Sequence, residues 1–213
     1  MEGFAEVTEE LINEYLSFFG KNHVFSDAER TLLNRNWTQL VVKKNERVVT
    51  EGQKTLLWVE KGVLRIGKKD SRHEGMDCVC GFAVPHDFVS MDWFLQAPEM
   101  VWNLYAEQDS VLWRLSDGVA SVLSDKVVLW DKIMTRWYAH YVKRLWMRNC
   151  YLCEANVVKR YRRMMEWEGK RLQAVSLKHL ASYLNMTPQT LSRIRKGEDG
   201  YKTCLLYTSD AAD

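Results

Sequence analysis

The spacing of apolar residues changes along the chain and predicts a β-region followed by helices. Residues 39 to about 116 form short runs in which apolar and β-branched residues alternate with polar ones, separated by turns of Gly, Asn, Asp and Lys. Such runs predict the strands of a small antiparallel roll or barrel. Residues 6 to 37 come before it, and their pattern predicts two short helices. We therefore expect an α+β fold.

After residue 116, apolar residues recur every three or four positions over about thirty residues. This spacing predicts one helix about 45 Å long, at about 1.5 Å per residue, which is more than a small domain needs for its own core. We expect the last five residues of the stripe to form the seam of a homodimer; packing against the chain's own β-roll is the alternative. The stripe consists of Val119, Leu123, Val127, Trp130, Met134, Trp137, Tyr141 and Leu145.

A further helix around residues 154 to 167 is followed by two short helical patterns with a tight corner between them. Ser176 is a good N-cap for the first of the pair, and Asn185 tolerates the left-handed backbone that such a corner needs. Thr187 can cap the second, with Pro188 at its first position, where a missing N–H costs nothing. The pattern predicts a helix-turn-helix.

The second helix of this pair presents polar side chains that suit DNA. Arg193 can donate two hydrogen bonds to a guanine edge, and Gln189 can pair with an adenine edge in the same bidentate way. Hydroxyl and ammonium groups nearby suit phosphate contacts. A helical hairpin with no nucleic-acid role is the alternative. The residues that we expect to contact DNA are Lys178, Thr187, Gln189, Thr190, Ser192, Arg193 and Lys196.

The net charge of +2 conceals an asymmetry between two parts of the chain. Residues 126 to 196 hold 16 Lys and Arg against 4 Asp and Glu, whereas the remainder holds 14 against 24. A local excess of basic charge is typical of a nucleic-acid-binding module attached to another domain. A solvated basic helix face is the alternative. Double-stranded DNA is the partner that this distribution favours.

Composition places the chain among soluble proteins of a reducing compartment. No run approaches the roughly 18 to 20 apolar residues of a membrane span, and the acidic N-terminus does not resemble a secretory signal. The five cysteines are spaced irregularly, which does not suit a disulfide framework. We therefore expect a cytoplasmic protein with no membrane partner.

Residues that ligate metals or catalyse reactions show no recognisable spacing. Cys78 and Cys80 form one pair and Cys150 and Cys153 another, but no further Cys or His completes a zinc or iron–sulfur set, so we expect buried, inert thiols. The five His residues are scattered. Without a ligand set or a nucleophile–base pair, we expect no metal, no cofactor and no enzymatic activity.

Taken in order, residues 6 to 196 resemble the Crp/Fnr family of bacterial transcription regulators. In the β-region the resemblance is carried by Lys44-Asn45-Glu46, Glu51-Gly52, Val59-Glu60-Lys61-Gly62-Val63-Leu64-Arg65 and His86-Asp87-Phe88-Val89. In the C-terminal part it is carried by Leu180-Ala181-Ser182-Tyr183-Leu184 and Thr187-Pro188-Gln189-Thr190-Leu191-Ser192-Arg193, and the latter looks like the form seen in Bacteroidetes-like members.

The resemblance implies a cyclic-nucleotide-binding-like β-roll of the double-stranded β-helix or jelly-roll type, a long dimer helix and a winged helix-turn-helix. It implies transcription regulation by a homodimer that reads an inverted repeat, with RNA polymerase as a further partner. Arg193 matches the base-reading arginine of the family, and Gln189 lies where many members have a glutamate. Pro188 lies where some members have a second arginine, so that contact is absent here.

The segment that binds the ligand in other members of the family has a different sequence here. Members that bind cyclic AMP hold its phosphate with an arginine late in the roll, but residues 85 to 110 here contain none. Because a buried phosphodiester needs a positive partner, we do not expect cyclic AMP to bind. Trp93, Trp102 and Tyr105 are candidates to line a pocket for an unknown small-molecule effector; a plain core is the alternative. A roll that acts only as scaffold is equally compatible with these residues.

These observations divide the chain into four parts: residues 1–116, the roll; 117–150, the dimer helix; 151–202, the helix-turn-helix; and 203–213, a tail. Residues 204 to 213 correspond in translation to a sequencing-library adapter, so we expect native sequence to end near Lys202 and the family's wing to be incomplete. The alternative function is an effector-sensing or protein-interaction module whose helix-turn-helix no longer binds DNA specifically.

Overall fold

The computed structural model describes the β-region and the C-terminal helices. The described residues are 26–28, 31, 36–49, 56–69, 77–90, 102–115, 125, 130–169 and 171–197. Of the two helices expected within residues 6 to 37, only residues 26–28, 31, 36 and 37 are described, and residues 27, 28 and 31 are helical. The start of the long helix, the wing and the tail lie outside these ranges.

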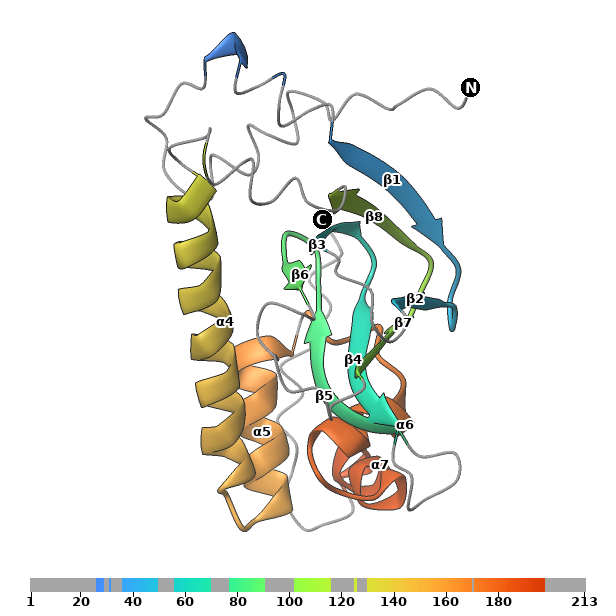
Figure 1. Ribbon diagram of the computed structural model, residues 1–213. Coiled ribbons are helices and arrows are strands. Elements are labelled where there is room, and N and C mark those ends of the chain that lie inside the picture. Colours follow the sequence, from blue (N-terminus) through green and yellow to red (C-terminus); the bar gives the residue numbers. More distant parts are fainter. Residues whose placement is uncertain are drawn as a thin grey trace, which may run out of the picture.

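The β-region is built from two antiparallel four-stranded sheets in the described part of the chain (Figure 1). One sheet has the strand order β1-β8-β3-β6 and the other β2-β7-β4-β5. The expected α+β fold with antiparallel sheets is thereby confirmed. The strands are β1 (Trp37–Val42), β2 (Arg47–Val49), β3 (Leu56–Lys61), β4 (Leu64–Lys69), β5 (Asp77–Ala83), β6 (Phe88–Ser90), β7 (Trp102–Ala106) and β8 (Ser110–Leu115).

The interior of the roll is apolar, because alternate residues of its strands point inward. These side chains come from both sheets, and the burial of each Val, Leu or Ile among them is worth roughly 1.5 to 3 kcal/mol relative to exposure. The cluster comprises Val42, Leu57, Val59, Leu64, Ile66, Ala83, Val89, Leu104, Ala106 and Leu112.

Tight turns join the strands where the sequence supplies suitable residues. Gly62, between β3 and β4, has φ +98°, and a Cβ there would lie 2.0 Å from the Ser110 hydroxyl oxygen. Asn45, between β1 and β2, has φ 68°, and its N–H donates to the Ala106 carbonyl at 2.7 Å. These two positions need the left-handed backbone that Gly and Asn tolerate best.

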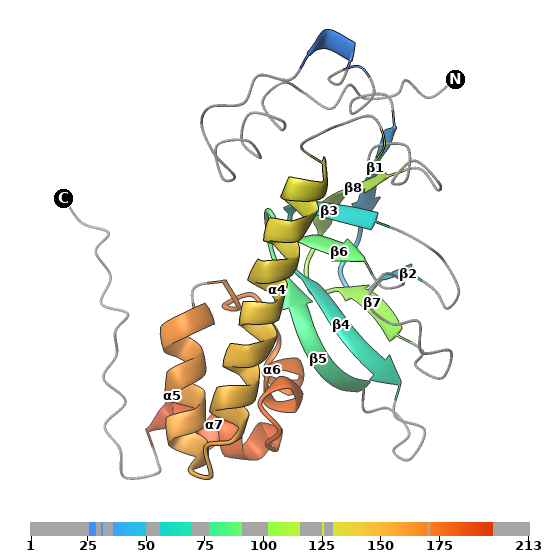
Figure 2. The ribbon, with the colours of Figure 1, turned by 60° about the vertical axis from the view of Figure 1, so that its left-hand side comes forward.

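Four helices follow: α4 (Trp130–Leu152), α5 (Val157–Glu168), α6 (Leu177–Tyr183) and α7 (Pro188–Lys196). The long helix α4 runs down one side of the roll, and α5 returns beside its lower half (Figures 1 and 2). The helix pair α6–α7 lies below the sheets, and α6 is next to the beginning of β5. No described helix is both long and apolar enough to cross a membrane.

The roll and the C-terminal helices share one hydrophobic cluster. Val63, Val79, Phe82 and Val84 of the roll are buried in it. The helices and the loop before α6 contribute Tyr151, Met164, Leu172, Val175, Leu180, Ala181, Tyr183, Leu184 and Leu191. The C-terminal helices are therefore packed against the roll and not simply tethered to it.

Candidate nucleic-acid interface

Local hydrogen bonds start α6 and α7 where the sequence predicts. The Ser176 hydroxyl accepts the N–H of His179 at 3.3 Å, and the Thr187 hydroxyl accepts the N–H of Thr190 at 3.1 Å. Pro188 occupies the first turn of α7. Each capping hydroxyl satisfies one N–H that the helix itself cannot pair, which stabilises the helix by about 1 kcal/mol.

The corner between α6 and α7 is closed by main-chain hydrogen bonds. Asn185 has φ 51°, the left-handed conformation that the sequence predicts. Its N–H donates to the Ser182 carbonyl, and the Met186 N–H donates to the Ala181 carbonyl, each at 3.0 Å. Ala181 is fully buried, so the small side chain permits the close approach at this point.

One face of α7 is buried and another is open. Leu191 and Ile194 are buried at 0% and 3% exposure, whereas Gln189, Arg193 and Lys196 are exposed. The exposed three follow one another at spacings of four and three residues, so they share one face of the helix. Gly197, with φ 73°, ends the helix.

The other expected DNA-contact residues lie on α6, on α7 and at the start of α7. Ser192 is half-buried, and Lys178 is exposed on α6. The Thr187 and Thr190 hydroxyls lie 2.8 Å apart and share a hydrogen bond, so both also take part in capping α7. The helix pair therefore brings all seven expected residues onto α6, α7 and the corner between them.

A second set of contacts fixes α6 against β5, which is an edge strand of its sheet among the described residues. The Val79 N–H donates to the Ser182 hydroxyl at 3.1 Å. The Arg148 guanidinium of α4 donates to the Tyr183 carbonyl at 3.2 Å and approaches the Val79 carbonyl at 3.4 Å. The Tyr183 hydroxyl lies 2.6 Å from that of Tyr151, and burial raises the pKa of both phenols.

Glu107, directly after β7 in the same sheet as β5, contacts the start of α6. Its carboxylate lies 2.6 Å from the His179 Nδ1 and 3.2 Å from the Arg65 Nε, and it accepts the Ser176 N–H at 3.3 Å. Burial acts to raise the pKa of Glu107, but His179, the Ser176 N–H and Arg65 outweigh it and lower that pKa. Glu107 is therefore held as a carboxylate that ties α6 to the roll.

A buried ion network joins the roll, α4 and α5. Arg144 of α4 donates to Asp87 at 2.6 Å and to Glu168 at 2.9 Å, and also to the Phe82 carbonyl at 3.0 Å. Burial acts to lower the pKa of Arg144, but the two carboxylates outweigh it and raise that pKa. Sequence reasoning missed this network, since its members lie 57 and 24 residues apart.

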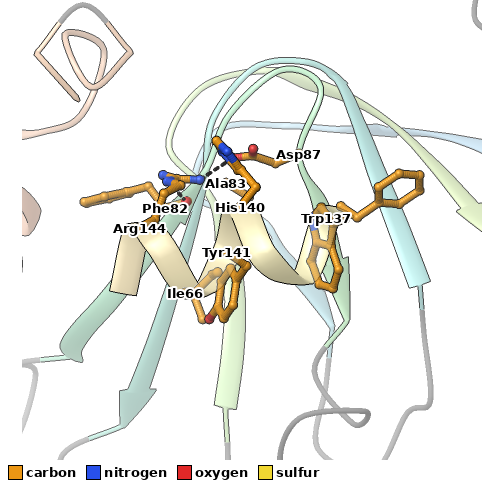
Figure 3. Close-up of a pocket in the computed structure, with 9 residues that line it drawn as sticks. Ile66, Phe82, Ala83, Asp87, Trp137, His140, Tyr141 and Arg144 are labelled. Atoms are coloured by element: carbon orange, nitrogen blue, oxygen red, sulfur yellow. Dashed lines mark hydrogen bonds and ion pairs between the residues drawn. The ribbon is translucent and has the colours of Figure 1, made fainter. Parts of the chain in front are cut away.

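Arg144 also borders a small cavity between α4 and the roll (Figure 3). Its volume of about 10 Å³ suits roughly one water molecule and no larger ligand. Burial lowers the pKa of His140 and raises that of Tyr141. The cavity is lined by Ile66, Phe82, Ala83, Asp87, Phe88, Trp137, His140, Tyr141 and Arg144.

The three residues expected to line an effector pocket do not border this cavity. Trp93 lies outside the described residues, and Trp102 is the first residue of β7. Tyr105 is half-buried, with the Arg65 guanidinium 4.8 Å from the centre of its ring. An effector site built on these three residues remains a prediction.

Most of the described residues in the apolar stripe expected to form a dimer seam are buried within the single chain. Trp130, Met134 and Trp137 are 3% to 5% exposed, and the Trp137 ring meets Phe88 edge-on at 6.2 Å. Tyr141 is half-buried. Only Leu145 is open, at 45% exposure. At Trp137 and Tyr141, which line the small cavity together with residues of the roll, the contacts agree with the alternative interpretation, packing against the roll.

A different set of apolar side chains on the helices is exposed. Val142 and Trp146 on α4 are 57% and 67% exposed, and Trp167 on α5 is 54% exposed. The cysteines are also more open than expected: Cys78, Cys150 and Cys153 are exposed, since they lie on an edge strand and beside the outer face of α4. The described residues include no group of His, Cys, Asp and Glu that could hold a metal ion.

Comparison with known proteins identifies the fold. No family model matches the sequence, and no curated protein matches it. Among solved structures, the c-di-GMP-responsive global regulator CLP of Xanthomonas campestris is similar, with a TM-score of 0.64 and 16% identity over 82% of this chain and 92% of that one.

Two further solved structures agree. A putative Crp/Fnr transcriptional regulator of Eubacterium rectale has a TM-score of 0.63 and 14% identity, over 82% of this chain and 84% of that one. FixK2 of Bradyrhizobium japonicum has a TM-score of 0.62 and 16% identity, over 75% of this chain and 83% of that one. The resemblance seen in the sequence is confirmed in three dimensions: this chain has the fold of the Crp/Fnr transcription regulators.

Proposed function

We propose that this chain is a DNA-binding transcription regulator of the Crp/Fnr type, which reads an inverted-repeat operator as a homodimer. The observation that carries the proposal is the open face of α7. Gln189, Arg193 and Lys196 are exposed together on a helix whose start and buried face are fixed by local contacts. A helix held in this way can enter a major groove without first paying the entropy of ordering itself.

A seam for the homodimer is available on the outer face of α4. Thr135, Ala139, Val142, Trp146 and Asn149 are all exposed and follow one another at spacings of four, three, four and three residues. This is the spacing of two-stranded coiled coils. We infer that two copies of α4 pair along this face, with Leu145 at its margin, while the expected residues Trp130, Met134 and Trp137 support the helix from within.

The roll is the element through which an effector would act on α6 and α7. The supporting observation is their shared cluster together with the contacts of Glu107 and Val79, since any movement of β5 must be followed by α6. The effector itself would be a small molecule other than cyclic AMP, and RNA polymerase is the partner through which a bound dimer would act, in the cytoplasm.

The experiment that tests the function is selection of bound DNA from a random pool by the full chain, in parallel with Arg193→Ala. We expect enrichment of an inverted repeat whose half-sites lie about one helical turn apart, roughly 34 Å, and loss of base preference in the variant. Affinity should fall steeply with salt for both proteins. Binding that is sequence-blind in the unmodified chain would instead favour a sensor or protein-interaction module.

A further inference from the structure

Arg160, at the end of the first turn of α5, makes an unusual set of contacts with the main chain. Its Nη1 donates to the carbonyls of Leu184 and Asn185, at 3.0 and 3.1 Å. Its Nε and Nη2 donate to the carbonyl of Glu154, at 3.1 and 2.9 Å. One guanidinium thus holds three carbonyls from two separate segments, while neighbouring Arg162 is exposed.

The two carbonyls at 184 and 185 belong to the corner that precedes α7. Leu184 is the residue that ends α6, and Asn185 holds the left-handed conformation. Carbonyls at the end of a helix lack a partner within it, so a cation that binds them stabilises that end and fixes the direction in which the chain leaves. Arg160 therefore acts on the orientation of α7 at its beginning.

The third carbonyl belongs to the connection between α4 and α5. Glu154 follows the end of α4, and its N–H donates to the Tyr151 carbonyl at 3.2 Å. The position of its carbonyl is accordingly tied to the last turn of α4. Arg160 thus connects the end of the long helix directly to the corner before α7, across a gap of 30 residues in sequence.

The next residue of α5 supports the other end of α7. Tyr161 is half-buried, and the Arg195 guanidinium lies 5.9 Å from the centre of its ring. Such a cation–π contact at a partly exposed site is weak, about 0.5 to 1 kcal/mol. Arg160 and Tyr161 together place both ends of α7 relative to α5, with Arg160 making the stronger and more directional contacts.

We propose that Arg160 is a positioning residue that sets the place of α7 relative to the dimer helix, and so determines which half-site spacing the homodimer accepts. The inference rests on the proposed function. In a two-fold dimer, the distance between the two reading helices depends on where each α7 lies relative to the seam on α4. Arg160 holds the residue after α4 and the corner before α7 together. It touches no base itself.

The test measures binding of the full chain to the selected operator and to operators with one or two base pairs inserted or removed between the half-sites. Each base pair inserted or removed changes the distance between the half-sites by about 3.4 Å and rotates one half-site relative to the other by about 35° about the DNA axis. We expect the unmodified protein to prefer one spacing by at least about tenfold. Arg160→Met should reduce affinity for that spacing by about tenfold, change the others less, and leave the preferred bases unaltered.

Three variants separate positioning from other roles. Arg162→Met removes the same charge from an exposed site of the same helix, so it should weaken binding equally at all spacings. Arg193→Ala should lose base preference. Arg160→Lys keeps the charge but lacks the fork that reaches both segments, so it should show a flattened spacing preference in a folded protein.

The outcomes are distinguishable. The proposal is overturned if the Arg160 variants keep the spacing preference of the unmodified protein. It is also overturned if they lose affinity by one common factor at every spacing and have a lowered Tm. Either result leaves the proposed function intact. If Arg160→Met does not fold, as judged by circular dichroism, the spacing profile of Arg160→Lys decides. Failure of the unmodified chain to select any operator would overturn the proposed function itself.

Discussion

Both faces of α4 carry apolar side chains, yet they differ in what covers them. On the inner face, Trp137 is 4% exposed against the roll; on the outer face, Trp146 is 67% exposed, nine positions further along. The inner face belongs to the fold of a single chain, whereas the outer face has no cover within the described residues. Tryptophan therefore stabilises the fold on the inner side of α4, and we propose that it stabilises the dimer on the outer side.

The largest change in stability should come from a substitution on the inner face of α4. Trp137→Ala removes a buried ring that contacts Phe88, and we expect the free energy of unfolding to fall by about 3 to 5 kcal/mol. Urea unfolding followed by circular dichroism measures this change. A loss below about 1 kcal/mol would show that the helix is not held against the roll in solution.

Arg144→Met should produce a slightly smaller loss, about 3 kcal/mol, because it leaves Glu168 buried without its cation and Asp87 with only the longer, 3.8 Å contact to Arg171. Adding Asp87→Asn and Glu168→Gln to the same chain should restore part of the stability, since the uncompensated charges are then gone. Urea midpoints of the single and triple variants test this. A triple variant less stable than Arg144→Met would contradict the explanation.

Trp146→Ala is the matched substitution on the outer face. We expect the stability of each chain to change by less than about 0.5 kcal/mol, as at most exposed sites. Dimer dissociation should instead become about 30-fold more favourable, the equivalent of losing about 2 kcal/mol at an interface centre. Sedimentation velocity at several concentrations measures it. A dimer as tight as the unmodified one would remove Trp146 from the seam.

The smallest effect should be a pH dependence from His140, which lies between the two faces. Burial lowers its pKa, with Arg144, Arg171 and Lys143 acting in the same direction and Asp87 against. Below the ordinary value of about 6.5 the unfolded chain then binds more protons, so folding stability declines as pH falls. His140→Gln should show a shallower decline in urea midpoint between pH 7.5 and 5.5; an unchanged slope would exclude this residue as the source.

The sequence predicts what is encoded locally. The caps at Ser176 and Thr187, the first-turn Pro188 and the left-handed Asn185 each depend on residues within one turn of the chain, so their chemistry could be recognised without a structure. The strand region is predictable for the same reason, because the alternation of apolar side chains reflects the pleat itself.

The sequence could not show which surfaces of the helices and the roll pack against each other. Periodicity marks a side of α4 as apolar but does not tell whether its cover is the roll or a second chain, and the more aromatic stripe is the internal one. The contacts of Arg144 with Asp87 and of Arg160 with Leu184 join residues 57 and 24 positions apart. Neither contact could be predicted from neighbouring residues, because an Arg among other basic residues is typical of a solvent-exposed helix face.

The contact of α6 with β5 also has a consequence for the biosynthesis of the protein. β5 ends its sheet, so the outward N–H and carbonyl of Val79 would be open to pairing with a strand of another molecule if Ser182 and Arg148 did not occupy them. During translation the roll is made before α6. Until α6 is made, this strand edge is open to pairing with another molecule, so α6, which pairs with the helix that we propose to read DNA, also protects the edge from aggregation.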